Sequence, residues 1–187
     1  MAEITRIGAV PPAGLANAPC PAAELRPLPN AARFIFRGDD DAVAAAGRAF
    51  GVELPTTACR ATTEGDRSAL WLGPDEWLIL APESAGEAIQ QAIAAGLGDI
   101  PHALVAVGHR NGGLEISGPA AATVLNGGCP LDLDPEAFPV GMCTRTILAK
   151  AEIVLWRTGP EVFHIEVWRS FASYVWLYLD EARREFR

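Results

Sequence analysis

The chain lacks the short motifs through which proteins bind metals and nucleotide phosphates. Its three histidines, His102, His109 and His164, occur in neither HxH nor HExxH spacing, and its cysteines form no CxxC pair. No GxGxxG or GxxxxGK[ST] sequence is present to cradle a phosphate, and Ser117 does not stand in a GxSxG nucleophile elbow. We therefore predict no catalytic, cofactor-binding or metal-binding residue in this chain.

The chain also lacks a basic patch, a secretory signal and a long apolar run. Its formal net charge of -8 repels phosphate backbones, which argues against nucleic-acid binding. No apolar stretch approaches the roughly 20 residues needed to span a bilayer, and no basic segment followed by an apolar one starts the chain. We expect a cytoplasmic protein without a membrane partner, with its cysteines, Cys20, Cys59, Cys129 and Cys143, as reduced thiols.

Two parts of the chain resemble each other, which indicates a duplication. Each contains a glycine–proline turn, an apolar run and a serine that precedes a helix, at residues 73–84 and 159–170. Each also contains a strand that ends in glycine before a helix, at residues 34–38 and 114–118. A fold built by duplication need not contain a catalytic site.

The two repeated units account for most of the chain. Strand and helix patterns follow the order β-β-α-β-β-β-α in the second unit, at about residues 103–187. The first unit, at about residues 31–98, matches if residues 24–29 supply its opening strand. Cys59 and Cys143 hold equivalent places between a helix and the strands that follow. We predict an α+β fold in which residues 31–187 form a single duplicated domain.

An Asn-Gly sequence at residues 111–112 is typical of a hairpin turn. It joins strands predicted at 103–107 and 114–117, and this turn also accounts for Gly113. His109 stands beside it, where we interpret it as an exposed polar residue and not as a catalytic residue or ligand.

Residues 1–30 differ in composition from the rest of the chain. They hold six prolines among alanines, and proline removes amide donors and favours extended backbone. We predict an arm, which is either disordered or becomes ordered on a partner.

The last helix, from Ser170, carries two apolar stripes. The main stripe, predicted to face the chain's own sheet, comprises Phe171, Tyr174, Val175, Tyr178, Leu179 and Ala182. Trp176 and Leu177 lie off this stripe, and we predict that a partner covers them. The other tryptophans are expected to pack in the core: Trp71, Trp77, Trp156 and Trp168.

Several segments, in order, resemble the γ subunit family of heterotetrameric sarcosine oxidase. They are WLGPDEWLIL at 71–80, LEISGP from 114, CPLDL at 129–133 and VWRSFASYVWLYL at 167–179. The likeness covers most of the chain after about residue 30. That family is similar in fold to the folate-binding domain of the glycine-cleavage aminomethyltransferases, itself a duplicated β-β-α-β-β-β-α arrangement.

The resemblance implies a non-catalytic accessory subunit of a complex that oxidises sarcosine to glycine, with tetrahydrofolate accepting the one-carbon unit. It implies α, β and δ subunits as partners, which carry FAD, FMN, NAD, tetrahydrofolate and zinc, and no cofactor in this chain. The candidate contacts with them are Trp176, Leu177 and the arm at residues 1–30. The alternative is a stand-alone folate-binding or C1-transfer protein.

Overall fold

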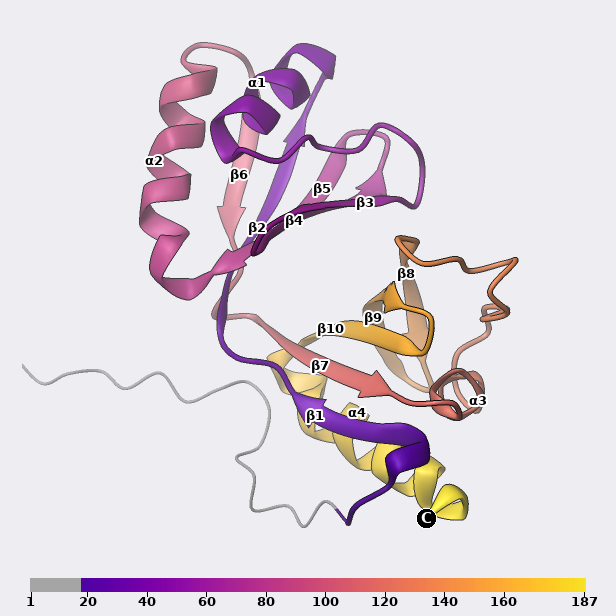
Figure 1. The fold of residues 1–187 in the computed structure, drawn as a ribbon. Coiled ribbons are helices and arrows are strands. Elements are labelled where there is room, and N and C mark those ends of the chain that lie inside the picture. The colour runs from indigo at the N-terminus through magenta and orange to yellow at the C-terminus, as the bar shows by residue number, and fades with distance from the viewer. Residues whose placement is uncertain (1–17) are drawn as a thin grey trace, which may run out of the picture.

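Two five-stranded antiparallel sheets, each with helices on its outer side, form the chain in a computed structural model that describes residues 18–187 (Figure 1). The first unit comprises β1 (Glu24–Pro27), β2 (Ala31–Gly38), α1 (Asp40–Phe50), β3 (Ala61–Glu64), β4 (Arg67–Gly73), β5 (Glu76–Pro82) and α2 (Gly86–Leu97). The second comprises β6 (His102–Ala106), β7 (Asn111–Ser117), α3 (Ala121–Asn126), β8 (Cys143–Leu148), β9 (Ala151–Gly159), β10 (Val162–Trp168) and α4 (Arg169–Ala182). Short 3-10 helices are η1 (Pro21–Ala23), η2 (Glu83–Ala85) and η3 (Arg183–Phe186). The predicted α+β fold with two β-β-α-β-β-β-α units is confirmed.

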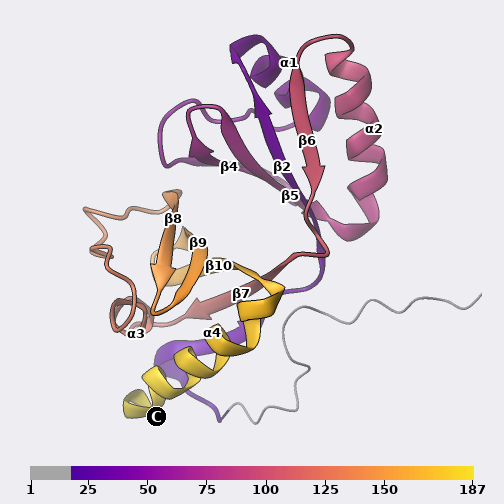
Figure 2. The same ribbon diagram turned by 180° about the vertical axis from the view of Figure 1, so that it is seen from behind.

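The opening strand of each unit belongs to the other unit's sheet. β1 lies antiparallel to β7, with Leu25 opposite Ile116, and β6 lies antiparallel to β2, with Val105 opposite Ile35. The strand orders are therefore β1-β7-β10-β9-β8 and β3-β4-β5-β2-β6. Figures 1 and 2 show the two crossing segments, from β1 to β2 and from β6 to β7, side by side where the sheets meet. This exchange connects the two units through both sheets.

The hairpin predicted at Asn111 and Gly112 is wrong, because β6 and β7 lie in different sheets. Both residues belong to β7. Val107 still follows β2, since its N–H donates to the carbonyl of Arg33 at 2.8 Å. The carbonyl of Val107 then accepts hydrogen bonds from the N–H groups of Arg110 and Asn111, both at 3.0 Å. This turn directs the chain out of one sheet and into the other.

The outer face of each sheet is apolar and packs against its own helices. Phe34, Phe36 and Ile79 lie in one core with α1 and α2, while Leu114 and Ile165 lie in another with α3 and α4. Alternate strand residues point to opposite faces, so the residues between these point toward the other sheet. No helix within residues 18–187 is both long and apolar enough to cross a membrane.

The predicted arm does not extend to residue 30. Residues 21–27 form η1 and β1, and Cys20, Ala23 and Leu25 are buried in the core beneath α4. The buried guanidinium of Arg183 donates to the carbonyl of Ala23 at 3.1 Å, which ties this segment to the end of α4. The arm prediction is therefore wrong for residues 20–27, and the opening strand expected at residues 24–29 is confirmed as β1. Residues 1–17 lie outside the described residues.

We expect Leu25→Ala to destabilise the isolated chain, because Leu25 is 1% exposed and fills the core of the other unit's sheet. The expected loss is about 3 kcal/mol, or about 6–12 °C in Tm for a chain of this size. Glu24→Ala, at the exposed neighbouring position, is the control and should melt like the unchanged protein. Thermal melts check the pair, and equal melting of both variants would contradict the place of β1 in the core.

Candidate functional site

The inner faces of the two sheets meet in a small apolar contact. Leu70, Leu78 and Leu80 of one sheet pack against Cys143 of the other, and all four are buried. An isolated bridge extends the contact between the sheets, and within it the N–H of Cys143 donates to the carbonyl of Cys59 at 3.0 Å. The two cysteines at equivalent places of the repeat thus face each other where the units meet.

A buried ion pair joins the sheets beside this contact. Arg33 of β2 donates from Nε to Glu166 Oε2 at 2.6 Å and from Nη2 to Glu166 Oε1 at 3.0 Å. The two side chains are 3% and 1% exposed. His164, two residues before Glu166 on β10, places its Nε2 at 2.8 Å from Glu166 Oε1. The carboxylate therefore receives a two-point contact from one sheet and a third contact from its own strand.

Gly113 makes room for this pair. A Cβ at this position would lie 2.9 Å from Arg33 Nη2 and 3.2 Å from Glu166 Oε1. Since Gly113 lies within β7 and not in a turn, the close approach of the guanidinium explains the glycine.

The environment of Glu166 favours its charged form. Burial alone would raise the pKa of this carboxyl, but the hydrogen bond from His164 and the charge of Arg33 outweigh burial and lower its pKa. A carboxylate held ionised, with both oxygens engaged, is not available as a general base or metal ligand. The geometry is that of a structural connection between the sheets.

Two cavities flank the ion pair, and Glu166 lines both. One, of about 320 Å³, has walls that include Ile35, Val105 and Trp168, with Arg110 among its polar residues. The other, of about 310 Å³, includes residues Ser68, Leu80, Trp156 and His164. Among the described residues, Trp156 Nε1 is the buried side-chain polar atom without a hydrogen-bond partner.

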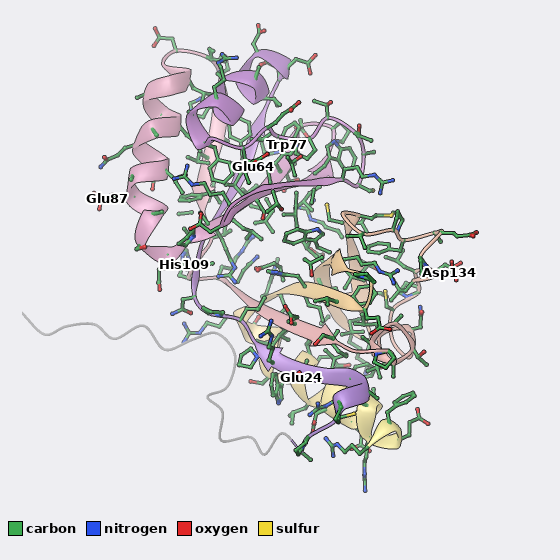
Figure 3. The ribbon with its side chains drawn as sticks, in the orientation of Figure 1. Glu24, Glu64, Trp77, Glu87, His109 and Asp134 are labelled. Atoms are coloured by element: carbon green, nitrogen blue, oxygen red, sulfur yellow. The ribbon has the colours of Figure 1, made fainter. Side chains whose placement is uncertain are left out.

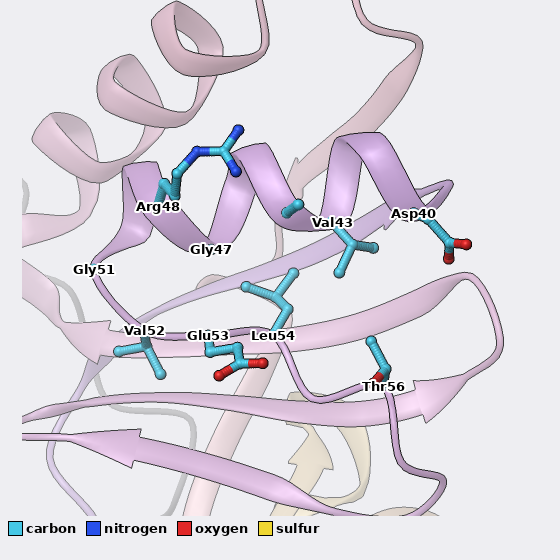
Figure 4. Close-up of a pocket in the computed structure, with 10 residues that line it drawn as sticks. Asp40, Val43, Gly47, Arg48, Gly51, Val52, Glu53, Leu54 and Thr56 are labelled. Atoms are coloured by element: carbon cyan, nitrogen blue, oxygen red, sulfur yellow. The ribbon is translucent and has the colours of Figure 1, made fainter.

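A third cavity, of about 510 Å³, lies away from the sheet junction, between α1 and the loop that follows it (Figure 4). Val43, Val52 and Leu54 make its walls apolar, and Asp40 and Arg48 also line it. This arrangement brings together no nucleophile and base.

The histidines and cysteines do not form a reactive cluster. His109 lies exposed in the crossing from β6 to β7, as predicted (Figure 3). Within residues 18–187, no three side chains of metal-binding type come together. Burial, with a smaller contribution from Cys59, raises the pKa of the Cys143 thiol to about 12, which disfavours the reactive thiolate.

The side of α4 that packs against the sheet differs from the side predicted from the sequence. The buried stripe is shifted by about one residue along the helix relative to the predicted stripe. The buried residues of this helix are Ala172, Val175, Trp176 and Leu179, and Arg183 of η3 is buried beyond them. The prediction for Trp176 is wrong, because this side chain is 6% exposed and packs in the chain's own core. A shift of one residue rotates a helix by about 100°. Val175 and Leu179 are buried as predicted, but the apolar pattern misplaces the rest of the stripe because the buried side of the helix ends in an arginine.

The rotation leaves large apolar side chains of α4 exposed. They are Phe171, Tyr174 and Leu177, which are 40%, 38% and 53% exposed, and Trp168, the last residue of β10, is 44% exposed at the start of the helix. We refer to these four residues as the α4 stripe. The predicted burial of Trp168, Phe171 and Tyr174 is therefore wrong. Leu177 is exposed, and its contact with a partner stays a prediction.

The sequence matches a model of the sarcosine oxidase, gamma subunit family over residues 37–185. It is 40% identical over 145 residues to the sarcosine oxidase subunit gamma of Corynebacterium sp. (strain P-1), covering 76% of this chain and 70% of that one. It is 38% identical over 144 residues to the subunit gamma of an Arthrobacter species, again covering 76% of this chain and 70% of the relative.

Two solved structures share the fold. One is a chain of the heterotetrameric sarcosine oxidase from Corynebacterium sp. U-96 in complex with pyrrole 2-carboxylate, with a TM-score of 0.84, 32% identity, and coverage of 90% of this chain and 87% of that chain. The other is the glycine cleavage system aminomethyltransferase T from Bartonella henselae, with a TM-score of 0.64, 16% identity, and coverage of 84% of this chain and 45% of that chain. The second likeness shows the fold alone.

At neutral pH we expect Glu166→Gln to lower the free energy of unfolding by about 3–5 kcal/mol, because Arg33 keeps a buried charge without its counter-charge. Since the pKa of Glu166 is lowered in the folded chain, its carboxylate stabilises the fold above the unfolded pKa of about 4.3. That stabilisation is lost as pH falls through the lower, folded pKa, so the difference between the two proteins should shrink in acid.

Denaturant melts of the two proteins at pH 7 and at a series of lower pH values test this expectation. Glu115→Gln is the control, because the partner of Glu115 is Arg26, whose side chain is 57% exposed, and such pairs contribute about 0–1 kcal/mol. A difference for Glu166→Gln that stays constant with pH would contradict the assignment.

Proposed function

The chain belongs to the sarcosine oxidase gamma subunit family, and we propose that it is a non-catalytic structural subunit of a heterotetrameric complex that oxidises sarcosine to glycine. The main observation in favour of a structural role is the exposed α4 stripe. Four large exposed apolar side chains, along a surface helix and at its start, favour burial against another protein. The buried carboxylate of Glu166 at the sheet junction, in contrast, is paired with Arg33 and hydrogen-bonded to His164.

The composition of the α4 stripe is that of an interface centre. Aromatic residues are enriched where protein partners exclude water, and three of the four residues are aromatic. The guanidinium of Arg110 stacks over the Trp168 ring at 5.2 Å from its centroid, which adds a cation at one end of the stripe. We propose that one of the larger subunits covers this surface.

The cofactors of the complex are proposed to lie in its other subunits. FAD, FMN, NAD and tetrahydrofolate would be held by the larger α and β subunits and zinc by the δ subunit. The support in this chain is a sequence without phosphate-cradling loops or metal-ligand spacing. A cytoplasmic location fits the four free cysteines, Cys20, Cys59, Cys129 and Cys143.

The alternative is a folate-binding or C1-transfer protein that acts by itself. The observation in its favour is the 320 Å³ cavity between the sheets, in a fold shared with an aminomethyltransferase. This volume lies at the lower end of the usual range for small-molecule sites, which is about 300–1,000 Å³. Titration of the isolated chain with tetrahydrofolate separates the two functions, since saturable binding would favour the alternative.

We expect Leu177→Ser to weaken assembly and to leave the isolated chain's Tm within a few degrees, because Leu177 is 53% exposed. Loss of a partner-covered apolar anchor costs about 2 kcal/mol, or roughly thirtyfold in affinity. Trp176→Ala is the matched control on the same helix. Because Trp176 is buried in the chain's own core, this variant should lower the free energy of unfolding of the isolated chain by about 3–5 kcal/mol. Melts of each isolated variant and co-purification with the other subunits measure both effects. Full assembly of Leu177→Ser, and of Phe171→Ser beside it, would contradict the proposed surface.

The isolated chain should contain neither flavin nor zinc when purified. The reason is the absence of binding motifs in its sequence. Absorbance in the flavin bands and metal analysis of the purified protein check this expectation. Stoichiometric flavin or zinc would show that the chain carries a cofactor of its own.

A further inference from the structure

Among residues 18–187, strand β6 (His102–Ala106) forms an edge of its sheet and pairs with β2 alone. Edge strands of folded proteins usually carry charged residues, prolines or bulges that prevent a further strand from adding. The other edge strands follow this rule, with Glu24, Arg26 and Pro27 in β1, Glu64 in β3 and Arg145 in β8. The sequence of β6, HALVA, contains none of these residues, and its Val105 is 55% exposed.

The free edge of β6 presents alternate backbone groups to solvent. Val107 donates its N–H to the carbonyl of Arg33, so this is a hydrogen-bonded pair. Pairs alternate along an antiparallel ladder, and the N–H groups of Val105 and Ala103 therefore also face β2. Those of His102, Leu104 and Ala106 face away from the sheet. Three amides and their carbonyls are thus available to an added strand.

A cation and a cavity with both apolar and charged walls lie beside this edge. Val105 and Val107 line the 320 Å³ cavity between the sheets, together with Arg110 and Trp168. The ion pairs among residues 18–187 do not include Arg110, whose Nε donates to the side chain of Asn111.

The other arginines of this cavity are already neutralised. Arg37 pairs with Asp75 at 3.2 Å, and Arg145 pairs with Glu76. In a chain of net charge -8, Arg110 is therefore a cation placed to receive an acidic group from outside.

We propose that an extended segment of another subunit of the complex adds to the free edge of β6, with an apolar side chain over Val105 and a carboxylate against Arg110. The unpaired amides of β6 favour an extended strand as the bound segment. A helix has no free backbone groups along its length that could pair with them. The positive charge of Arg110 favours a bound segment that carries an acidic residue. The inference rests on the proposed function, because it takes the occupant from the same complex.

Hydrogen–deuterium exchange of the isolated chain and of the assembled complex tests the proposal. The amides of Leu104 and Ala106 should exchange rapidly in the isolated chain and at least about tenfold more slowly in the complex. Slow exchange in the isolated chain would overturn the proposal, because the edge would then be covered within this chain or by a second copy. Assembly without slowing at these amides would overturn the inference and leave the proposed function standing. Failure of the chain to assemble with the other subunits would overturn both.

Two variants at one position sharpen the test. Ala106→Pro removes an outward N–H that β2 does not use, so proline is tolerated there while an added strand loses a hydrogen bond. Ala106→Thr keeps the N–H at the same exposed position and is the matched control. We expect Ala106→Pro to weaken assembly about tenfold or more, and Ala106→Thr to assemble normally. Equal assembly of the two variants would overturn the proposal, and if Ala106→Pro fails to fold, the exchange measurement on the unchanged protein decides.

A third variant tests the charge. Arg110→Gln should weaken assembly and reduce its dependence on salt, because one attractive ionic contact is lost. Unchanged affinity and unchanged salt dependence would overturn the acidic character of the occupant.

Discussion

One buried ion pair, between Arg33 of β2 and Glu166 of β10, constrains how the two sheets can face each other. A charge taken out of water loses several kcal/mol of hydration free energy, so neither side chain can stay buried without the other. Each charge therefore holds its own sheet against the opposite one. The requirement extends to Gly113, whose missing side chain leaves space for the guanidinium, and to His164, which contacts the same carboxylate. Glu166 also contributes to the walls of the cavities on either side of the pair.

The sequence predicts the units of this fold better than their connections. Strand and helix periodicities are local, so the order of elements in both repeats follows from them. The partner of an opening strand is not local, and nothing near residues 24–27 or 103–107 indicates that these strands exchange sheets. The Asn-Gly pair at 111–112 even favours a hairpin, because its turn chemistry is the same whether or not the flanking strands pair.

The site is harder to predict than the fold, for two physical reasons. Arg33 and Glu166 each interrupt an apolar strand, which marks them as unusual, but only the facing of the two sheets shows that they pair. In α4, both sides of the helix are rich in apolar and aromatic residues, so periodicity alone fits two orientations one residue apart. Arg183 decides between them through its bonds to Asp180 and to the carbonyl of Ala23, and a buried arginine is invisible to a hydrophobic pattern.

The exchange of opening strands also determines how this chain can be synthesised. Leu25 must pair opposite Ile116, and the edge of β2 remains open until β6 has been made. While the ribosome is still translating the second repeat, the first repeat therefore has an incomplete sheet and a strand with no sheet to join. Pairings between residues so distant in sequence form slowly, and unpaired strand edges promote aggregation in the meantime. Each half of the gene thus encodes a piece of the other half's sheet, so neither half can be separated and expressed as a complete fold.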